Sequence, residues 1–434
     1  MFKFAGLVVL ANAHNVKNVV HVMMENRAFD TIFGYLTHTT DIDNLVGKEP
    51  FCNYVNVNDP NSLKVCTAPN QVDTSIYGPD HGYFETTNEL YGTNDPSVPL
   101  PEVAPMNGFA QQAYNSAFKG ADAAHLQQVM AGFDPKNIPV HATLASEFTI
   151  FDRWFAAIPG PTQPNRVSSH CATSKGWYNN DGTKLAEGND CRSIFQDLSD
   201  AGLTWKNYFQ EVPSFFFLRN TRLQMAANSK VWSSFVSDAQ SGNLPNYSFL
   251  EPNFGELKQN QATYNGNLQL IVDGHAGEPG FFHNAEYFLK ELYETLRNSP
   301  QWESTLLLIT YDEHGGFFDH VPPPKAPNPD GITTPDPDHA GVVYSFDRLG
   351  VRVPVIAVSP WVAKGKVEHE PKGPHPDSQY SHASIPATIR SIFKLSSPPL
   401  TAREAWSGDF ESILMDTPRD DCPYVMPAVN MNGF

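Results

Sequence analysis

The feature that most constrains the fold is an apolar run at residues 306–309, LLLI, with a dense polar cluster directly after it. A run of this kind is typical of a buried strand in a parallel sheet. The next residues, 310–324, read TYDEHGGFFDHVPPP and include three acids, two histidines and two glycines. In an open α/β sheet, ligands bind at the carboxyl ends of the strands. The sequence therefore predicts one wall of a functional site at the end of a buried strand.

The first two acids of this cluster, Asp312 and Glu313, are adjacent in the sequence. Two carboxylates at a buried strand end repel each other, so one of them would stay protonated unless a cation neutralised the pair. This arrangement indicates half of a metal-assisted active site. Asp319 and His320, further along the cluster, fit a role in loop architecture better than one in the chemistry.

Composition narrows the classes of protein that the chain could represent. Its 434 residues, 41% of them hydrophobic, are ample for a large core, and the absence of a repeat or long linker favours one domain over residues 14–434. The net charge of −18 argues against nucleic-acid binding, which needs Lys and Arg along the phosphate backbone. The same charge disfavours tight adsorption to anionic membranes and leaves room for transient contact with a membrane surface at most. Nothing in the composition implies a protein partner.

The N-terminus predicts export from the cell. Residues 1–13 combine a basic start, a short apolar segment and an Ala-Asn-Ala end, as in a signal peptide, although the segment is short and a truncated first strand is the alternative. No later stretch reaches the roughly 18 apolar residues that a membrane helix needs. We therefore expect a secreted protein.

The five cysteines fit an oxidising compartment. Cys52 and Cys66 bracket one polar loop, and Cys171 and Cys191 bracket another, so we predict these two local disulfides with Cys422 left over. The alternative is five reduced thiols.

The periodicity of apolar residues predicts alternating strands and helices. Residues 18–24 and 351–358 have strand patterns, although Pro354 suits an edge strand better than a central one. Residues 284–297 and 384–393 have helical periods. Alternation of this kind predicts an α/β sheet sandwich. The segments 40–110 and 322–346 are rich in Asp, Asn and Pro, and we expect them to be rich in loops.

A second polar pair, Glu25 and Asn26, follows the predicted strand at residues 18–24. A carboxylate and an amide oxygen at a strand end are hard donors suited to a divalent cation. The alternative is a helix cap, since Asn and Asp often begin helices.

The segment PGPTQPNR at residues 159–166 is stiffened by prolines and presents one hydroxyl, at Thr162, with Arg166 close behind. If a short helix follows from Asn165, its free N–H groups would favour a phosphate oxygen. These residues suit a nucleophile beside a phosphate cradle. A plain Pro-rich turn satisfies them equally well.

Several histidines lie in loops rich in Gly or Ser, among them His81, His275 and His382. Phosphoryl transfer needs a proton donor for the leaving oxygen and positive charge near the equatorial oxygens, and imidazoles supply both. A single histidine is more often a surface or packing residue.

Four motifs in order resemble the phosphoesterase family, which includes phospholipases C and some acid phosphatases. They are MMENRAFD at residues 23–30, GPTQPNR at 160–166, YDEHGGFFDH at 311–320 and SHAS at 381–384. Ala28 stands where the family usually has Ser. The resemblance covers residues 18 to about 395. It implies an alkaline-phosphatase-like three-layer α/β/α sandwich around a mostly parallel sheet.

The resemblance also assigns roles to residues. Thr162 would be the nucleophile, and Arg166 and Asn165 would bind the substrate. A divalent metal ion would be held by Glu25, Asn26, Asp312, Glu313 and Thr162. Four histidines would line the phosphate pocket: His382, His81, His275 and His314.

The implied function is a secreted, metal-dependent phospholipase C that acts through a phosphothreonine intermediate and releases diacylglycerol and a phosphorylated head group. An acid phosphomonoesterase with the same site is the first alternative, so the substrate is either a phospholipid or a phosphomonoester. A secreted binding protein that has lost catalysis is the second. The aromatic run at residues 215–217 reads as ordinary core, with a lipid-facing lip as the alternative.

Overall fold

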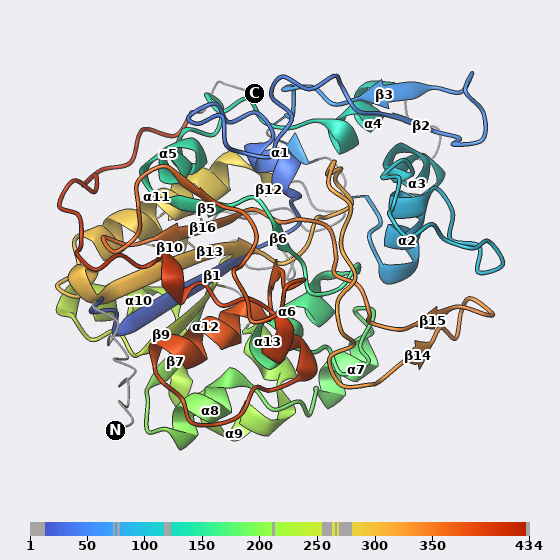
Figure 1. Ribbon diagram of the computed structural model, residues 1–434. Coiled ribbons are helices and arrows are strands. Elements are labelled where there is room, and N and C mark those ends of the chain that lie inside the picture. The colour runs from blue at the N-terminus through green and yellow to red at the C-terminus, as the bar shows by residue number, and fades with distance from the viewer. Residues whose placement is uncertain are drawn as a thin grey trace, which may run out of the picture.

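A central sheet of eight strands organises the molecule (Figure 1). The computed structural model describes residues 14–72, 74–75, 79–116, 123–210, 213–253, 263–264, 267–268 and 280–430. In sheet order the strands are β17 (Lys366–Glu368), β5 (Thr149–Phe151), β16 (Val355–Val358), β13 (Thr305–Tyr311), β1 (Asn18–Met24), β9 (Tyr247–Glu251), β7 (Trp205–Phe209) and β8 (Ser229–Val231).

The sheet is mostly parallel. Strands β13, β1, β9, β7 and β8 run parallel to one another, and β17 runs parallel to β5. Only β16 is antiparallel to its two neighbours, β13 and β5. The parallel arrangement brings the carboxyl ends of β13, β1 and β9 to one edge of the sheet.

Helices cover both faces, so the structure confirms the predicted three-layer α/β/α sandwich (Figure 1). One face carries α5 (Pro139–Glu147), α10 (Trp232–Ser241) and α11 (His283–Arg297). The other carries α6 (Thr162–Cys171), α8 (Ile194–Asp200) and α12 (Ser384–Ile392). The shorter helices are α1 (Phe29–Phe33), α7 (Gly182–Glu187), α9 (Arg222–Asn228) and α13 (Ala402–Trp406).

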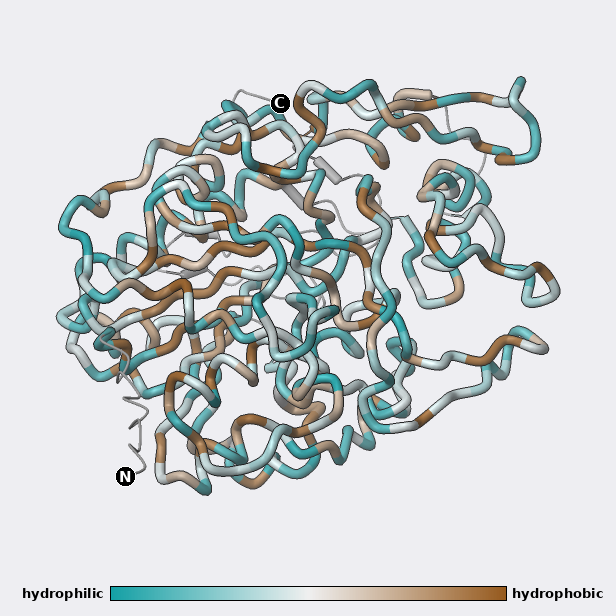
Figure 2. The backbone as a smooth tube through the Cα atoms, viewed as in Figure 1, coloured by the Kyte–Doolittle hydropathy of each residue, from teal (hydrophilic) through white to brown (hydrophobic). Residues whose placement is uncertain are grey.

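The central strands are buried on both faces, which is why they read as continuous apolar runs. Every residue of β1 and β13 is buried. Figure 2 shows these strands as hydrophobic segments at the centre of the molecule. The helical patterns also match the structure, because α11 and α12 lie within one residue of the predicted bounds.

A smaller unit lies beside the sandwich and is formed by α2 (Tyr83–Tyr91), α3 (Phe109–Asn115) and α4 (Ala123–Met130). It includes the hairpin of β2 (Cys52–Tyr54) and β3 (Lys64–Cys66). Phe317 and Phe318, from the motif after β13, belong to its hydrophobic core. These two phenylalanines therefore tie the unit to the end of the central strand.

The segment 40–110 is rich in loops, as expected, and it also contains α2 and the β2–β3 hairpin. One expectation about local structure is wrong. Strand β16 lies inside the sheet, whereas Pro354 had suggested an edge. A proline is tolerated here because β16 begins at Val355. Pro354 therefore precedes the strand, and its missing N–H removes no hydrogen bond between β16 and its neighbours.

The remaining short strands pair in two-stranded ladders outside the central sheet. They are β4 (Thr74–Ser75), β6 (Trp154–Phe155), β10 (Thr263–Tyr264), β11 (Asn267–Leu268), β12 (Gly280–Phe281), β14 (Thr334–Pro335), β15 (Val343–Tyr344) and β18 (Tyr380–Ser381). Over the described residues, every helix is too short or too polar to cross a membrane.

Both predicted disulfides are present. Cys52 is bonded to Cys66 across the β2–β3 hairpin, and Cys171 at the end of α6 is bonded to Cys191. Cys422 is a buried free thiol, as expected. The predicted signal peptide at residues 1–13 lies outside the described residues.

Candidate active site

The ends of β1 and β13 bring two of the sequence motifs together. The strands pair in parallel with Met24 opposite Tyr311, so the residues that follow each strand lie at the same edge. The Asp312 N–H donates to the Met24 carbonyl at 3.2 Å, and the Asn26 N–H donates to Asp312 Oδ1 at 3.1 Å. The four side chains predicted to hold a metal are all buried: Glu25, Asn26, Asp312 and Glu313.

A glycine makes this close approach of the two chain segments possible. Gly315 has a φ of +65°, in the left-handed region that side chains disfavour. A Cβ atom at this position would lie 2.6 Å from the carbonyl oxygen of Asn26. The glycine that follows the acids therefore serves the packing of one motif against the other.

Thr162 is the first residue of helix α6, and Pro161 precedes it in an extended conformation. Its side chain is fully buried, and its Oγ1 donates to Glu25 Oε1 at 3.1 Å. The helix therefore begins at Thr162 itself and not at Asn165. This start places the hydroxyl where the free N–H groups of the first turn lie.

Asn165 holds the loop that carries Thr162. Its Nδ2 donates to the carbonyls of Gly160 at 2.9 Å and Pro161 at 3.2 Å, and its Oδ1 accepts from the Ile158 N–H at 3.1 Å. These contacts give Asn165 a positioning role. Its predicted role in substrate binding stays a prediction.

Arg166 lies between the two acidic segments. Its NH2 is 2.7 Å from Glu25 Oε2, and its Nε is 3.1 Å from Asp312 Oδ2. Burial and the nearby Glu25 nevertheless raise the pKa of Asp312 well above its ordinary value, with Arg166 opposing them. One guanidinium thus offsets only part of the negative charge gathered here.

Two histidines contact Glu313. His81 Nδ1 donates to the Pro79 carbonyl at 2.6 Å, and its Nε2 is 3.1 Å from Glu313 Oε1. Burial by itself would lower the pKa of His81, but the Glu313 carboxylate outweighs it and raises this pKa to about 10. His314 Nδ1 is 3.4 Å from Glu313 Oε2, and its Nε2 is 2.7 Å from Glu89.

His382 is fixed through both ring nitrogens. Nε2 donates to the Asp312 carbonyl at 2.6 Å, and Nδ1 accepts from the Trp154 indole N–H at 3.3 Å. Burial lowers the pKa of His382 to about 4, so the ring is neutral at pH 7. The structure places His382 against the main chain of the acidic segment. His275 lies outside the described residues.

Two carboxylates near the site were missed from the sequence. Glu89, on α2, is the partner of His314. Glu251 is the last residue of β9, and its Oε1 is 4.0 Å from Arg166 NH1. Burial raises the pKa of Glu251 to about 7, with Arg166 opposing it. The sequence did contain a signal for Glu251. Like the acids that follow β1 and β13, it lies at the end of an apolar strand pattern.

The residues at this edge fit a divalent cation. Asn26 has a φ of 59°, and both its side-chain Oδ1 and Nδ2 are buried without a hydrogen-bond partner. Buried polar atoms are normally satisfied, so an orphaned amide beside three carboxylates favours a ligand that the amide oxygen would contact. An all-oxygen donor set of this kind suits a hard cation such as Mg²⁺, Ca²⁺ or Mn²⁺.

A second acidic cluster, formed by Asp30, Asp319 and His320, has the spacing of a metal site. A guanidinium already supplies positive charge there. Arg352 Nε lies 2.9 Å from Asp319 Oδ1, and its NH2 lies 3.1 Å from Asp30 Oδ1, with the arginine fully buried. This cluster is an internal ion-pair network, in agreement with the architectural role expected for Asp319 and His320.

Comparison with known proteins identifies the family. The model of the Phosphoesterase family matches residues 16–396. The chain belongs to this family. It is 43% identical to non-specific phospholipase C1 of Arabidopsis thaliana, over 96% of this chain and 74% of that protein. It is 27% identical to phospholipase C B of Mycobacterium tuberculosis, strain H37Rv, over 92% of this chain and 77% of that protein.

Among solved structures, a protein of the alkaline phosphatase superfamily from Vibrio parahaemolyticus aligns with a TM-score of 0.37 and 10% identity, over 62% of this chain and 63% of that one. Membership of the family makes this protein a phosphoric ester hydrolase. The roles of the individual site residues remain predictions that rest on the geometry described above.

The Arg352 network yields a prediction about stability. Arg352→Met leaves the carboxylates of Asp30 and Asp319 buried without their cation, so we expect a loss of about 3–5 kcal/mol. Arg153→Met is the matched control, because Arg153 pairs with Glu370 on the surface and such pairs contribute about 0–1 kcal/mol. Urea unfolding of the two variants measures both values. Equal effects would contradict the assignment.

The same network predicts a pH dependence. Burial alone would lower the pKa of His320, but hydrogen bonds to Asp30 and Asp43 outweigh it and raise this pKa to about 9. Because the folded protein binds this proton more tightly than the unfolded chain, the stabilisation is complete below pH 6.5 and is lost as the pH rises through 9. The charged groups that face the ring are Asp30, Asp43, Asp319, Lys48 and Arg352.

We therefore expect the wild type to exceed His320→Gln in unfolding free energy at pH 6, and this difference to close by about pH 10. Urea unfolding of both proteins at pH 6, 8 and 10 measures it. A difference that does not change with pH would show that the ring charge has no part in it.

Proposed function

We propose that this protein is a secreted, metal-dependent phospholipase C that hydrolyses phospholipids to diacylglycerol and a phosphorylated head group. The observation that carries the proposal is the buried hydrogen bond from Thr162 Oγ1 to Glu25 at the edge where the β1 and β13 acids meet. The similarity to proteins named phospholipase C, at 38–43% identity over most of the chain for the plant relatives, supports the choice of a phospholipid. Secretion rests on the segment at residues 1–13.

In the proposed first step, Thr162 Oγ1 attacks phosphorus, a new P–O bond forms, and the bond from phosphorus to the diacylglycerol oxygen breaks. Glu25 accepts the hydrogen bond of the hydroxyl and takes its proton as the new P–O bond forms. Asn165 fixes the loop beneath it through the Gly160 and Pro161 carbonyls. The departing oxygen takes a proton, for which the N–H groups of His81 and His314 beside Glu313 are the candidate donors.

In the second step, water attacks phosphorus and passes a proton to the histidine that protonated the diacylglycerol oxygen. The P–O bond to Thr162 breaks, the threonine oxygen regains its proton from Glu25, and the phosphorylated head group leaves. Glu25, Asn26, Asp312, Glu313 and the Thr162 hydroxyl would hold the divalent ion. When bound, such an ion supplies positive charge that stabilises the charge developing on the phosphoryl oxygens.

The nucleophile assignment predicts the effect of two substitutions at one position. Thr162→Ala removes the attacking oxygen, and we expect kcat to fall by at least about a thousandfold, as it does when other nucleophiles are removed. Thr162→Ser keeps a hydroxyl, and we expect it to retain measurable turnover and an adduct of the phosphorylated head group on the peptide that contains residue 162. Product analysis on mixed phospholipids and mass spectrometry after an acid quench measure these outcomes.

The control is Thr388→Ala, which removes another buried threonine hydroxyl in α12, outside the site. An active Thr162→Ala enzyme would overturn the assignment. Wild-type turnover of a soluble aryl phosphate without any release of diacylglycerol from lipid would favour a phosphomonoesterase instead.

The metal assignment predicts which acidic cluster binds the ion. Adding Mg²⁺, Ca²⁺ or Mn²⁺ to chelator-treated wild type should raise the melting temperature, because a ligand that binds only the folded state stabilises it. Asn26→Ala should abolish this shift. Asp319→Asn should keep it, since Arg352 already neutralises that cluster.

Differential scanning fluorimetry with and without each metal measures the shift independently of activity. If the melting-temperature shift is lost in Asp319→Asn and kept in Asn26→Ala, the ion binds at the cluster of Asp30, Asp319 and His320 instead.

A further inference from the structure

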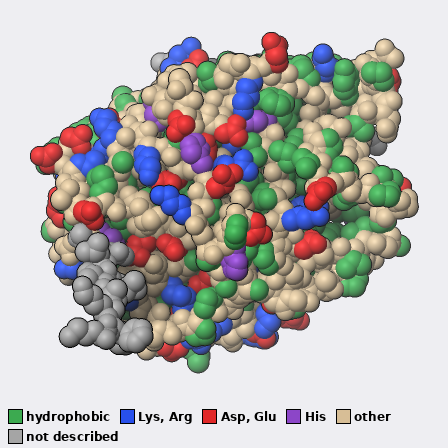
Figure 3. Space-filling view, in the orientation of Figure 1, with side chains coloured by type: hydrophobic (Ala, Val, Ile, Leu, Met, Phe, Trp, Pro, Cys, Tyr) green, Lys and Arg blue, Asp and Glu red, His purple; other side chains and the backbone are tan. Residues whose placement is uncertain are grey.

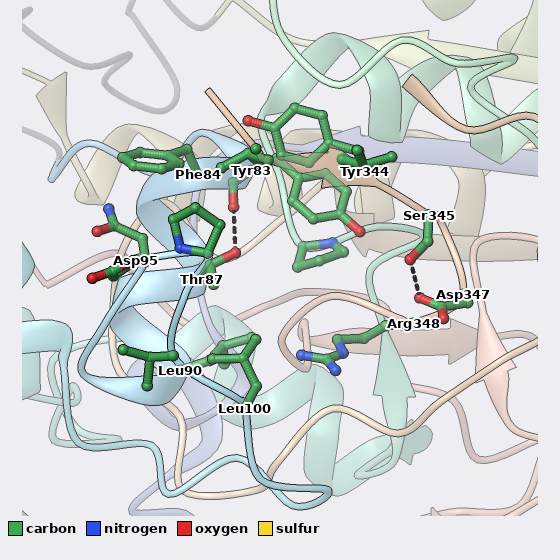
Figure 4. Close-up of a pocket in the computed structure, with 17 residues that line it drawn as sticks. Tyr83, Phe84, Thr87, Leu90, Asp95, Leu100, Tyr344, Ser345, Asp347 and Arg348 are labelled. Atoms are coloured by element: carbon green, nitrogen blue, oxygen red, sulfur yellow. Dashed lines mark hydrogen bonds between the residues drawn. The ribbon is translucent and has the colours of Figure 1, made fainter. Parts of the chain in front are cut away.

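A crevice of about 250 Å³ lies between helix α2, the loop at residues 94–100 and the segment at residues 341–348 (Figure 4). Below it is called the α2 crevice. Its walls are mainly apolar. They include Tyr83 and Leu90 from α2, Leu100 from the loop, and Val343 and Tyr344 from β15.

The α2 crevice adjoins the loop that carries Thr162. Pro159, which lines it, is three residues before Thr162 in the same rigid loop. A Cβ atom on Gly160 would lie 3.5 Å from the Cβ of Tyr83, so the nucleophile loop packs directly against the crevice wall. On α2, Glu89 pairs with His314 of the site, while the next residue, Leu90, lines the crevice. One helix therefore serves both.

The rim of the α2 crevice exposes large apolar side chains to solvent. Val98 is 43% exposed, Leu100 is 39% exposed and Val343 is 55% exposed, and all three line the crevice. They lie on two segments that project on the same side of the molecule (Figure 1). Figure 3 shows hydrophobic side chains on both of these projections. Apolar surface gathered around a cavity marks a place where an apolar ligand is removed from water.

The charges of the α2 crevice favour the uncharged part of a lipid. Asp95 and Asp347 line it, and their carboxylates repel a phosphate group. Arg348 also lines it, with its guanidinium 4.9 Å from the centre of the Tyr91 ring, and can donate to ester carbonyl oxygens. The two carboxylates outnumber the single guanidinium, so the net charge of the crevice disfavours a phosphate group.

The size of the α2 crevice limits what it holds. Cavities that enclose a whole small-molecule ligand span roughly 300–1,000 Å³, which is above the volume here. A diacylglycerol therefore cannot be enclosed completely. The exposed rim lets the ends of the acyl chains remain in the lipid aggregate from which the substrate comes.

We propose that the α2 crevice binds the glycerol ester and the first acyl methylenes of a phospholipid, while Val98, Leu100 and Val343 insert into the lipid surface. This inference rests on the proposed phospholipase C function and adds to it the subsite for the leaving group. The occupant is the diacylglycerol part of the same phospholipid molecule whose phosphate lies at Thr162.

The test compares two substrates that share the phosphodiester and differ in the lipid part. One is long-chain phosphatidylcholine in vesicles, and the other is a soluble aryl diester of phosphocholine. The double variant Leu100→Asp/Val343→Asp places charge on the rim at two exposed positions. We expect its kcat/KM on vesicles to fall at least tenfold through a higher KM, and its kcat/KM on the aryl diester to change less than twofold.

The matched control is Val231→Asp/Val425→Asp, which changes side chains that are 52% and 68% exposed and lie outside the crevice. We expect this control to resemble the wild type on both substrates. Co-sedimentation with phosphatidylcholine vesicles gives a second readout, which should fall in the rim variant alone.

The outcomes separate this inference from the proposed function. A wild type that hydrolyses neither substrate overturns both. A wild type active on both, with the rim variant equal to the control, overturns the crevice inference alone. An equal loss on both substrates overturns it as well. A loss confined to phosphatidylcholine and absent with phosphatidylethanolamine vesicles overturns it in favour of a head-group site.

Discussion

The structure depends on how buried negative charge is neutralised at the carboxyl edge of the central sheet. Arg166 contacts Glu25 after β1 and Asp312 after β13, and it is carried by the helix that begins at Thr162. These buried ion pairs therefore hold the ends of β1 and β13 against helix α6. Because a buried charge without a partner is costly, this contact fixes the relative positions of all three elements. It also orients the Thr162 hydroxyl toward Glu25.

The two acidic clusters described for this edge and for Arg352 differ in their balance of charge. In one, Arg352 pairs with Asp30 and Asp319 and fills the space between them. In the other, Arg166 leaves the pKa of Asp312 raised and the Asn26 amide unpartnered. Spacing alone favours the first cluster as a metal site. The incompletely neutralised charge and the unpartnered Asn26 amide favour the Arg166 cluster as the metal site. The Arg352 cluster is therefore assigned a structural role.

Much of the fold could be read from local patterns, because strands buried on both faces must be continuously apolar. Strand β1 and helices α11 and α12 were predicted almost to the residue. The patterns failed where the signal was not local. Helix α2 is short and buries polar as well as apolar residues, so it has no clear apolar period. It is stabilised by packing Leu90 and Tyr91 in a core shared with Phe109 and Phe318. Because helix α2 was not predicted, its residue Glu89 was not recognised as the partner of His314.

The sequence by itself determined the chemical groups of the site: acids after two apolar strands, a hydroxyl in a proline-stiffened loop and an arginine four residues later. Their order matched one family, and their chemistry required a parallel sheet to bring them together. Only the tertiary structure decided which groups touch. It assigned Arg166 to the acids and Asn165 to the loop, and it placed an apolar crevice against the nucleophile loop. The Arg166 contacts join residues more than a hundred positions apart, and the register of β1 on β13 and the packing of α6 against the strand ends set them.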